Sequence, residues 1–309
     1  MNQIDWMKTS VGVSVHWTSH SGAQDGSRAS YEEGVNAFDA ARFVETLKKA
    51  GAKHLIFTLT HAEQYLAYPC APLEHLLSGR TTRRDLLGEL AARLDEAGIR
   101  LIAYYNHSCN GHDDPPWRRA CGYENGDMDR FAGNICAVVG DVARHLGSLL
   151  HGWWFDSASS IDPRGPRNTV SCPMGDWRFP WDRLVSAARA GNPQCAISIN
   201  AGVGLNFTYT PAQNFCAGES VQLDERFNPP APGMVDHRWI TLDNPEWVYA
   251  ADGPAPFRPL RFSDDDVAAF IRRNRQNGRM TTFNMEVDRA GLINPQTMAQ
   301  FRRVLSAIQ

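Results

Sequence analysis

Several polar side chains that can act as acid, base or nucleophile directly follow apolar runs of this sequence. Asp156 ends the run that begins at His151, His16 ends another, and Asn200 ends a third. A carboxylate that leaves an apolar strand is partly removed from water, which is costly unless the group is paired or used. Carboxylates beside histidine and amide groups suit nucleophilic or general acid–base chemistry. The structural alternative for Asp156 is a cap on the loop that follows it.

Aromatic, histidine and carboxylate side chains mark the ends of the other apolar runs. Flat C–H faces of a sugar stack on aromatic rings and its hydroxyls need fixed donors and acceptors, so this mixture is typical of a carbohydrate site. We therefore predict a carbohydrate substrate. The residues expected to contact it are His16, Trp17, His61, Tyr105, His107, Asn200 and Glu286.

Residues 107–114 contain histidine, cysteine and aspartate side chains, all of which bind zinc. Their spacing matches no common zinc site, and no His-x-His follows the first predicted strand. A serine nucleophile is not favoured because the sequence has no Gly-x-Ser-x-Gly elbow. Cys109, near His107 and His112, lacks an accompanying oxyanion-loop signal. We predict no metal ion and no organic cofactor, with a metal-dependent barrel hydrolase as a less favoured alternative.

Strands that alternate with helices must position these side chains. Apolar or alternating runs predict strands at residues 11–17, 53–59, 100–105, 151–156, 195–200 and 280–284, with shorter ones at 220–223 and 246–249. Periodicity and caps predict helices at 39–50, 82–97, 127–146, 181–190, after Ser263, and at 295–308. Such an alternation favours parallel pairing, and eight strands close a barrel with its chemistry at their carboxyl ends. We predict an α/β fold, a (β/α)8 TIM-type barrel, with irregularity in strands five to seven.

Length and charge set further limits. The 309 residues fit one barrel catalytic domain spanning 1–309. The 31 basic and 34 acidic residues give a net charge of −3, so we expect no nucleic-acid and no membrane partner. The 7 cysteines include no CxxC pair, which favours reduced thiols. Residues 1–10 lack the apolar stretch of a signal peptide, so a cytoplasmic protein and a secreted or periplasmic one whose signal was removed both remain open, as does the oligomeric state.

Six segments of the sequence resemble, in the same order, those of the family 29 α-L-fucosidases. They are residues 13–17 with the His16-Trp17 pair, 50–61, 101–105, Trp154-Phe155-Asp156, 247–249, and 278–291. The resemblance extends over almost the whole chain. It implies a retaining exo-glycosidase on a (β/α)8 barrel, acting on an α-L-fucoside or a related sugar such as an L-galactoside or an arabinopyranoside.

The resemblance also implies roles for single residues. Asp156 stands at the position of the family's nucleophile, which forms a covalent glycosyl-enzyme. His16, His61 and Tyr105 stand at positions that hold sugar hydroxyls. Retention requires a second carboxyl about 5–5.5 Å from the nucleophile.

The sequence identifies the second carboxyl, the acid/base, less clearly than it identifies the nucleophile. Many family members carry a glutamate after Thr-Pro or Thr-Ala, whereas here Thr210-Pro211 is followed by alanine and glutamine. Glu219, at the start of the sixth strand, is the nearest carboxylate and is our expected acid/base, with Glu246 and Glu286 as competitors. In place of the family's Asn-Asp-Arg, the chain has Asn200-Ala201-Gly202. A second hypothesis is therefore a catalytically silent carbohydrate-binding barrel.

Overall fold

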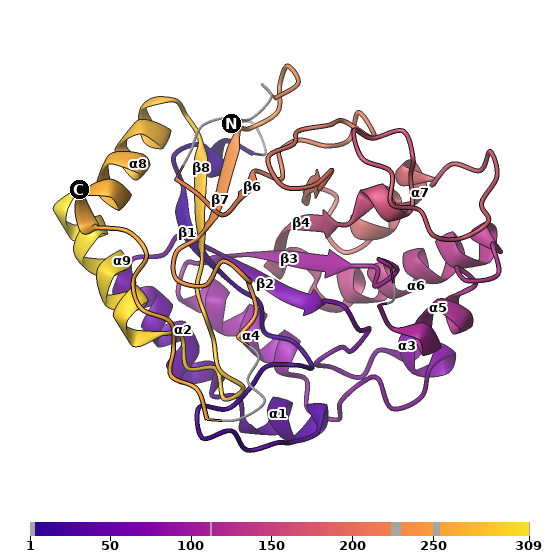
Figure 1. The fold of residues 1–309 in the computed structure, drawn as a ribbon, viewed down its shortest axis with the longest axis horizontal. Helices are drawn as coiled ribbons and strands as arrows, with labels where there is room; N and C mark the ends of the chain where they lie inside the picture. The colour runs from indigo at the N-terminus through magenta and orange to yellow at the C-terminus, as the bar shows by residue number, and fades with distance from the viewer. Residues whose placement is uncertain (1–3, 112, 224–229, 250–253, 309) are drawn as a thin grey trace.

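In the described part of the chain, eight parallel strands and the helices between them make up the fold (Figure 1). The computed structural model describes residues 4–111, 113–223, 230–249 and 254–308. The strands are β1 (Val11–Val15), β2 (His54–Thr60), β3 (Arg100–Asn106), β4 (Leu150–Asp156), β5 (Ala196–Ile199), β6 (Glu219–Ser220), β7 (His237–Thr241) and β8 (Met280–Asn284). Their order is β5-β4-β3-β2-β1-β8-β7-β6, with parallel pairing throughout. The first and last strands are neighbours, so the predicted α/β barrel architecture is confirmed.

The barrel is incomplete between β5 and β6. Among the described residues no ladder joins these two strands, and β6 is only 2 residues long. The backbone amides of Asn214 and Phe215 instead donate to the carbonyl oxygen of Ile197 in β5, at 3.0 and 3.5 Å. The sheet is therefore a curled half-barrel whose irregular edge lies where irregularity was predicted.

Helices cover the outer face of the sheet (Figure 1). The longer ones are α2 (Ala40–Ala50), α4 (Leu86–Glu96), α6 (Met128–Leu146), α7 (Trp181–Ala188), α8 (Asp264–Gln276) and α9 (Pro295–Ala307). Two predicted caps are confirmed: Asp39 accepts from the Arg42 amide at 2.9 Å, and Ser263 accepts from the Asp266 amide at 3.1 Å. Gly51 closes α2 with φ of 83°, a left-handed conformation that glycine adopts without strain.

Shorter helices fill the connections and were not predicted. They are α1 (Tyr31–Ala37), α3 (Ala71–Leu76) and α5 (Pro115–Cys121), with 3₁₀ turns η1 (Asp5–Met7), η2 (Gly147–Leu149) and η3 (Ala158–Ser160). Helices this short show too little periodicity to be recognised in a sequence. None of the helices in the described ranges has the length and apolar character needed to cross a bilayer.

The strand predicted at residues 246–249 is wrong. The seventh strand is β7, and residues 246–249 form a loop in which Trp247 has φ of 70°. Aromatic and β-branched residues favour strands in general, but a left-handed residue interrupts an extended run. The loop instead places Val248 beside His16 in an isolated bridge. The predicted sixth strand also shifts, from 220–223 to Glu219–Ser220.

Alternation along each strand divides the core into two layers. The side chains of Tyr104, Trp154 and Trp239 fill the barrel interior, together with Ile56, Ile102 and Met280. The neighbouring Trp153 faces the helices, where its Nε1 donates to the carbonyl of Ala188 at 2.9 Å. Trp154 Nε1 donates across the interior to the carbonyl of Ala217 at 3.1 Å. The polar residues that follow these strands therefore extend the interior layer toward the carboxyl end of the barrel.

Candidate active site

Asp156 ends β4, and four donors surround its carboxylate. Its Oδ2 accepts from the Tyr104 hydroxyl at 2.5 Å and from Asn106 Nδ2 at 3.0 Å. Its Oδ1 accepts from Asn200 Nδ2 at 2.8 Å and from the Ser157 amide at 2.7 Å. Hydrogen bonds donated to both oxygens stabilise the charged form of a carboxyl group. Asp156 is half-buried, so it is a fixed carboxylate that a substrate can still reach.

Glu219 faces Asp156 across the side chain of Asn200. Asn200 Nδ2 donates to Glu219 Oε2 at 2.7 Å and to Asp156 Oδ1 at 2.8 Å. The Gly202 amide donates to Asn200 Oδ1 at 2.9 Å, which fixes the orientation of the amide group. The two carboxylate oxygens therefore lie no further apart than 5.5 Å, the sum of their distances to the shared nitrogen.

The two acids have different electrostatic surroundings. Burial raises the pKa of Glu219 above its usual range, and the negative charge of Asp156 raises it further. The hydrogen bond from Asn200 and the nearby charge of Arg167 lower it, but less strongly. Glu219 therefore tends to hold its proton, as the general acid of an active-site acid–base pair does.

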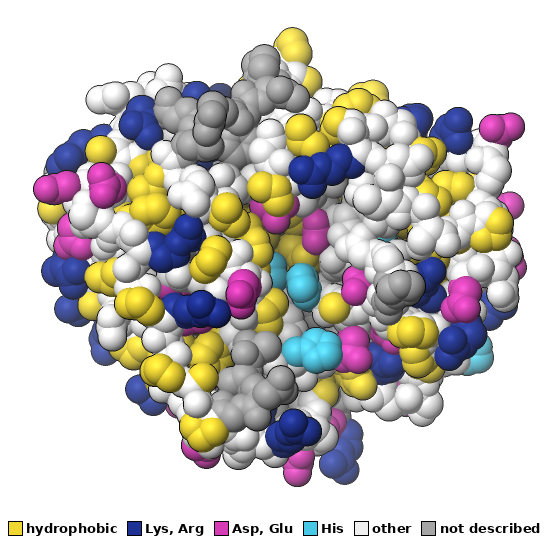
Figure 2. All heavy atoms as spheres, viewed as in Figure 1, with side chains coloured by type: hydrophobic (Ala, Val, Ile, Leu, Met, Phe, Trp, Pro, Cys, Tyr) yellow, Lys and Arg dark blue, Asp and Glu magenta, His cyan; other side chains and the backbone are white. Residues whose placement is uncertain are grey.

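Histidine and aromatic rings form the wall next to the acid pair. His16 stacks on Trp239 with ring centroids 5.6 Å apart, and it meets the edges of Tyr104 at 5.0 Å and His61 at 5.3 Å. The half-buried ring of Trp247 lies 5.4 Å from His16. Figure 2 shows histidine and acidic side chains gathered around a hollow near the centre of one face of the molecule. Such a wall combines apolar faces with polar edges, as a sugar requires.

Both histidines of this wall are neutral near neutral pH. Burial lowers the pKa of His16 to about 3 and also lowers the pKa of His61. Asn284 Nδ2 donates to the Trp247 carbonyl at 3.0 Å, so its Oδ1 must accept from His16 Nδ1–H at 2.8 Å. His16 Nε2 then carries a lone pair and has no hydrogen-bond partner among the described residues. It can accept a hydrogen bond from a substrate hydroxyl.

The structure brings five of the predicted residues together: Asp156, Glu219, Asn200, His16 and His61. Two competing acids lie elsewhere. Glu246 is exposed and pairs with Arg258 at 3.1 Å. Glu286 is buried and accepts from Asn244 Nδ2 at 2.9 Å and from the Arg258 amide at 2.6 Å.

Three further predicted contact residues also point away from the acid pair. Trp17 packs between the sheet and the helices, where its Nε1 donates to the Arg289 carbonyl at 3.0 Å. Tyr105 lies in the same outer layer and donates to Gln64 Oε1 at 3.0 Å. The ring of His107 is buried, and its Nδ1 accepts from the Cys109 amide at 3.1 Å. Its Nε2 must therefore donate to the Ser157 carbonyl, 2.8 Å away, so His107 supports the loop that follows Asp156.

A family model for alpha-L-fucosidases matches residues 4–253. The chain belongs to the alpha-L-fucosidase family. The resemblance seen in its sequence is therefore confirmed. Among curated proteins, none matches it.

Solved structures share the fold of this family member at low sequence identity. Endo-fucoidan hydrolase MfFcnA4 from glycoside hydrolase family 107 is 15% identical with a TM-score of 0.72, covering 99% of this chain and 53% of that chain. Alpha-L-fucosidase AlfC from Lactobacillus casei is 16% identical with a TM-score of 0.69, covering 99% and 98%. Endo-fucoidan hydrolase P5AFcnA is 14% identical with a TM-score of 0.72, covering 99% and 93%. The chain thus spans about half the length of MfFcnA4 and nearly all of AlfC.

Several residues of the site were not among the predicted ones. Tyr104 and Asn106 could have been found from strand alternation, because they share a face and pair in register with Trp154 and Asp156. Asp113, on the loop after β3, had no such signal. Burial raises its pKa to about 6, and the charge of Asp156 contributes. Trp239, Trp247, Asn284 and Arg167 also belong to the surroundings of the acid pair.

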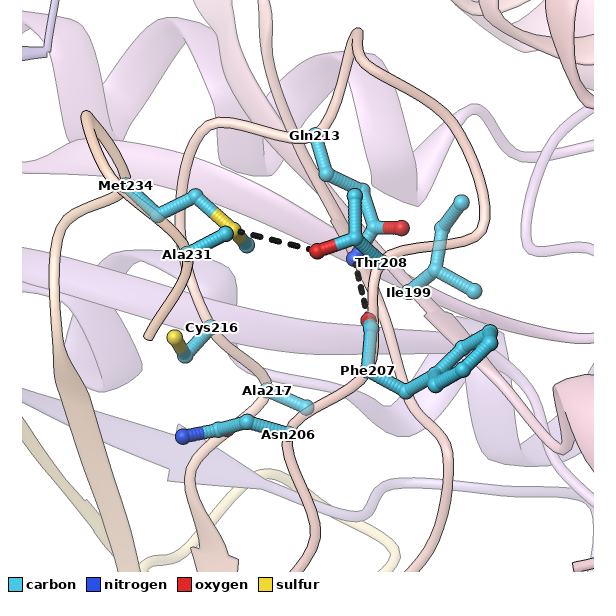
Figure 3. Close-up of a pocket in the computed structure, with 9 residues that line it drawn as sticks. All are labelled: Ile199, Asn206, Phe207, Thr208, Gln213, Cys216, Ala217, Ala231 and Met234. Atoms are coloured by element: carbon cyan, nitrogen blue, oxygen red, sulfur yellow. Dashed lines mark hydrogen bonds between the residues drawn. The ribbon is translucent and has the colours of Figure 1, made fainter. Parts of the chain in front are cut away.

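A cavity of about 230 Å³ lies beside the gap between β5 and β6 (Figure 3). Its lining residues are Ile199, Asn206, Phe207, Thr208, Gln213, Cys216, Ala217, Ala231 and Met234. These described lining residues include no carboxylate, so the acid pair lies outside this cavity. Two of its lining residues are close in sequence to residues of the site: Ile199 precedes Asn200, and Ala217 lies two residues before Glu219.

The loop that carries zinc-binding residue types makes other contacts. Asp114 caps α5 by accepting from the Trp117 amide at 3.3 Å, and it pairs with Arg80 at 2.9 Å. His112 lies outside the described residues. Within the described ranges, no group of three or more His, Cys, Asp or Glu side chains is placed to hold a metal ion.

Proposed function

We propose that this member of the alpha-L-fucosidase family is a retaining exo-glycoside hydrolase that acts on an α-L-fucoside or a closely related sugar, with residues 1–309 as one catalytic barrel domain. The observation that carries the proposal is the pair formed by Asp156 and Glu219. One oxygen of each carboxyl accepts a hydrogen bond from the same nitrogen, Asn200 Nδ2, so these two oxygens lie within 5.5 Å of each other. Retaining enzymes place their carboxyls about 5–5.5 Å apart, whereas inverting enzymes need roughly 6.5–9.5 Å to admit a water molecule.

The nature of the sugar is supported by the family and by two structures of AlfC. One contains an alpha-L-fucose product, and the other, a single-residue variant, contains Fuca(1,6)GlcNAc. In this chain, neutral His16 and His61 offer ring nitrogens to sugar hydroxyls, and Trp247 offers an accessible ring face. These groups make the wall described above suitable for a pyranose with one apolar face.

In the first chemical step, Asp156 attacks the anomeric carbon and the bond to the leaving oxygen breaks. Glu219 gives its proton to that oxygen, so the leaving group departs as a neutral alcohol and Glu219 becomes a carboxylate. Tyr104, Asn106 and Asn200 hold the attacking carboxylate in place, which lowers the cost of orienting it. The product of this step is a glycosyl ester of Asp156.

In the second step, water attacks the same carbon and the ester bond to Asp156 breaks. Glu219, now ionised, takes a proton from the water and returns to its acid form. Two inversions at the anomeric carbon restore its original configuration. Because Asn200 contacts both carboxylates, it keeps them in register through both steps.

A panel of para-nitrophenyl glycosides, with the first-formed product anomer identified by NMR, tests the proposal. We expect release from the α-L-fucoside or a close stereochemical relative, with the α-anomer appearing first. Initial formation of the β-anomer would contradict the double displacement. Binding of sugars without release from any glycoside, natural oligosaccharides included, would favour the silent carbohydrate-binding barrel. Loss of release with a chelator would favour the metal-dependent hydrolase.

A further inference from the structure

Arg167 lies on the loop between η3 and α7, against the turn at Gly202 that follows β5. This loop is fixed on both sides of the arginine. The Thr169 amide donates to the Ser159 carbonyl at 2.9 Å, and the buried carboxylate of Asp162 accepts from Trp181 Nε1 at 2.7 Å. These contacts fix the position of the backbone from which the exposed Arg167 side chain extends.

Gly202 leaves room for the guanidinium of Arg167. A Cβ atom at this glycine would lie 3.1 Å from Arg167 Nη1 and 3.3 Å from Cζ. The Gly202 amide donates to Asn200 Oδ1, and the Gly204 amide donates to the backbone carbonyl of Glu219, both at 2.9 Å. Arg167 therefore rests on the turn that is hydrogen-bonded to both Asn200 and Glu219.

The guanidinium of Arg167 differs in its contacts from that of its neighbour Arg164. Within the described ranges, neither an ion-pair partner nor a hydrogen-bond acceptor contacts it. The neighbouring Arg164, by contrast, pairs with Asp162 at 2.5 Å. The positive charge of Arg167 acts instead on Glu219. A planar guanidinium with free donors is suited to bind the two oxygens of a carboxylate or a sulfate.

The proposed role of Glu219 indicates which part of a substrate lies next to Arg167. In the proposed reaction, Glu219 gives its proton to the leaving oxygen, so groups beside Glu219 lie next to the leaving group. Arg167 is not among the donors that surround the Asp156 carboxylate. We propose that Arg167 binds an anionic oxygen group, a carboxylate or a sulfate ester, on the leaving group of the substrate. This inference rests on the proposed function and adds the class of leaving group.

The charge preference is tested with three probes: para-nitrophenyl α-L-fucopyranoside and two analogues whose phenol ring carries a carboxylate or a sulfate. Each variant is compared with the unsubstituted protein on the same probe, which cancels differences in phenol acidity. We expect Arg167→Gln to lower kcat/KM on a charged probe by roughly fivefold and to change the neutral probe much less. The preference should weaken at high salt, because exposed charge pairs are screened. Comparison of the two charged probes separates carboxylate from sulfate recognition.

Two further variants serve as matched controls. Arg167→Lys keeps the charge and should retain most of the preference. Arg178→Gln removes another exposed arginine from the same loop and should leave the preference unchanged. An equal loss on charged and neutral probes in Arg167→Gln would overturn the inference.

The pH profile gives a readout that a purely structural role would not change. Burial and the charge of Asp156 raise the pKa of Glu219, whereas Asn200 and Arg167 lower it. Arg167→Gln should therefore raise this pKa further and move the alkaline limb of kcat/KM on the neutral probe to higher pH, while Arg167→Lys should not. Hydrolysis of the neutral probe without any charge preference would overturn the role of Arg167 and leave the proposed function standing. Absence of hydrolysis from every glycoside would overturn both.

Discussion

Two pairs of acids lie at the carboxyl end of this barrel, and they differ in what surrounds them. Asp156 and Glu219 belong to the ends of β4 and β6, while Asp243 and Glu286 follow β7 and β8. Each pair contains a glutamate with a raised pKa, and for Glu286 burial raises it to about 7. By titration alone, either glutamate qualifies as a general acid.

The pair formed by Asp243 and Glu286 is enclosed by the protein's own hydrogen-bond donors, unlike the pair formed by Asp156 and Glu219. Asp243 accepts from the amides of Asn244 and Glu286 and from the side chains of Asn294 and Thr297. Glu286 is 1% exposed, and both of its oxygens accept from the protein's own groups. The first pair is half-buried and open to a substrate. A raised pKa is therefore a sign of burial, and it marks a catalytic acid only where the acid also faces a second carboxylate across accessible space.

The largest effect should follow from removing the carboxylate of Asp156. Asp156→Ala removes the proposed nucleophile, so we expect kcat to fall by on the order of 10⁴-fold or more, with the folded state retained. Activity is measured on the para-nitrophenyl substrate and folding by circular dichroism. Azide, entering the space left in Asp156→Gly, should restore release and yield a glycosyl azide of inverted configuration. Near-normal turnover in Asp156→Ala would remove the assignment.

A smaller loss is expected for Glu219→Gln, and its size should depend on the leaving group. Loss of general acid catalysis costs about 10²–10⁴-fold for a natural alcohol, and much less for para-nitrophenolate, which needs little protonation. The raised pKa of Glu219 means that the acid form is lost only at alkaline pH, so the alkaline limb of kcat/KM should disappear in this variant. Equal losses on good and poor leaving groups would argue against Glu219 as the acid.

The sequence predicts the barrel well where strands are apolar and poorly where polar residues are buried. Strand β7 contains His237 and Arg238, which do not suggest a buried strand. They are accommodated by partners that include Thr282 Oγ1, 2.8 Å from His237 Nε2, and Asp236, which pairs with Arg238 at 2.5 Å. The contact with Thr282 becomes visible only after the chain has folded.

The same limit applies to the site. Strand ends identify Asp156, His16 and Asn200 because each follows a recognisable apolar run. The sequence alone does not show which of the adjacent residues Tyr104 and Tyr105 faces the site. The register between β3 and β4 shows that it is Tyr104, which pairs with Trp154. Arg167 lies on an irregular loop, and no local pattern of the sequence indicates that it approaches Glu219.

A substitution at Tyr104 tests how much the hydrogen bonds around Asp156 contribute to activity. Its hydroxyl donates to Asp156 Oδ2, and Tyr104→Phe removes this donor while keeping the ring between His16 and Trp154. A hydrogen bond to a charged group contributes about 1.5–3 kcal/mol, so we expect kcat/KM to fall by roughly 10- to 100-fold. Tyr105→Phe, in the outer layer, is the matched control and should affect stability more than turnover. Equal effects of the two changes on kcat/KM would contradict the assigned positions.

The smallest effect on activity is expected at Glu286, where the substitution should act on stability. Glu286→Gln presents an amide N–H₂ group to the Arg258 amide or to Asn244, and an unsatisfied buried donor costs about 1–3 kcal/mol. Because the pKa of Glu286 is higher in the folded protein than in the unfolded chain, its contribution to stability is fully present below pH 4.5 and is lost as the pH rises through about 7. The destabilisation by Glu286→Gln should therefore be larger at pH 5 than at pH 8 in urea denaturation. Loss of turnover comparable to that of Glu219→Gln, without loss of stability, would mean that the second pair also takes part in catalysis.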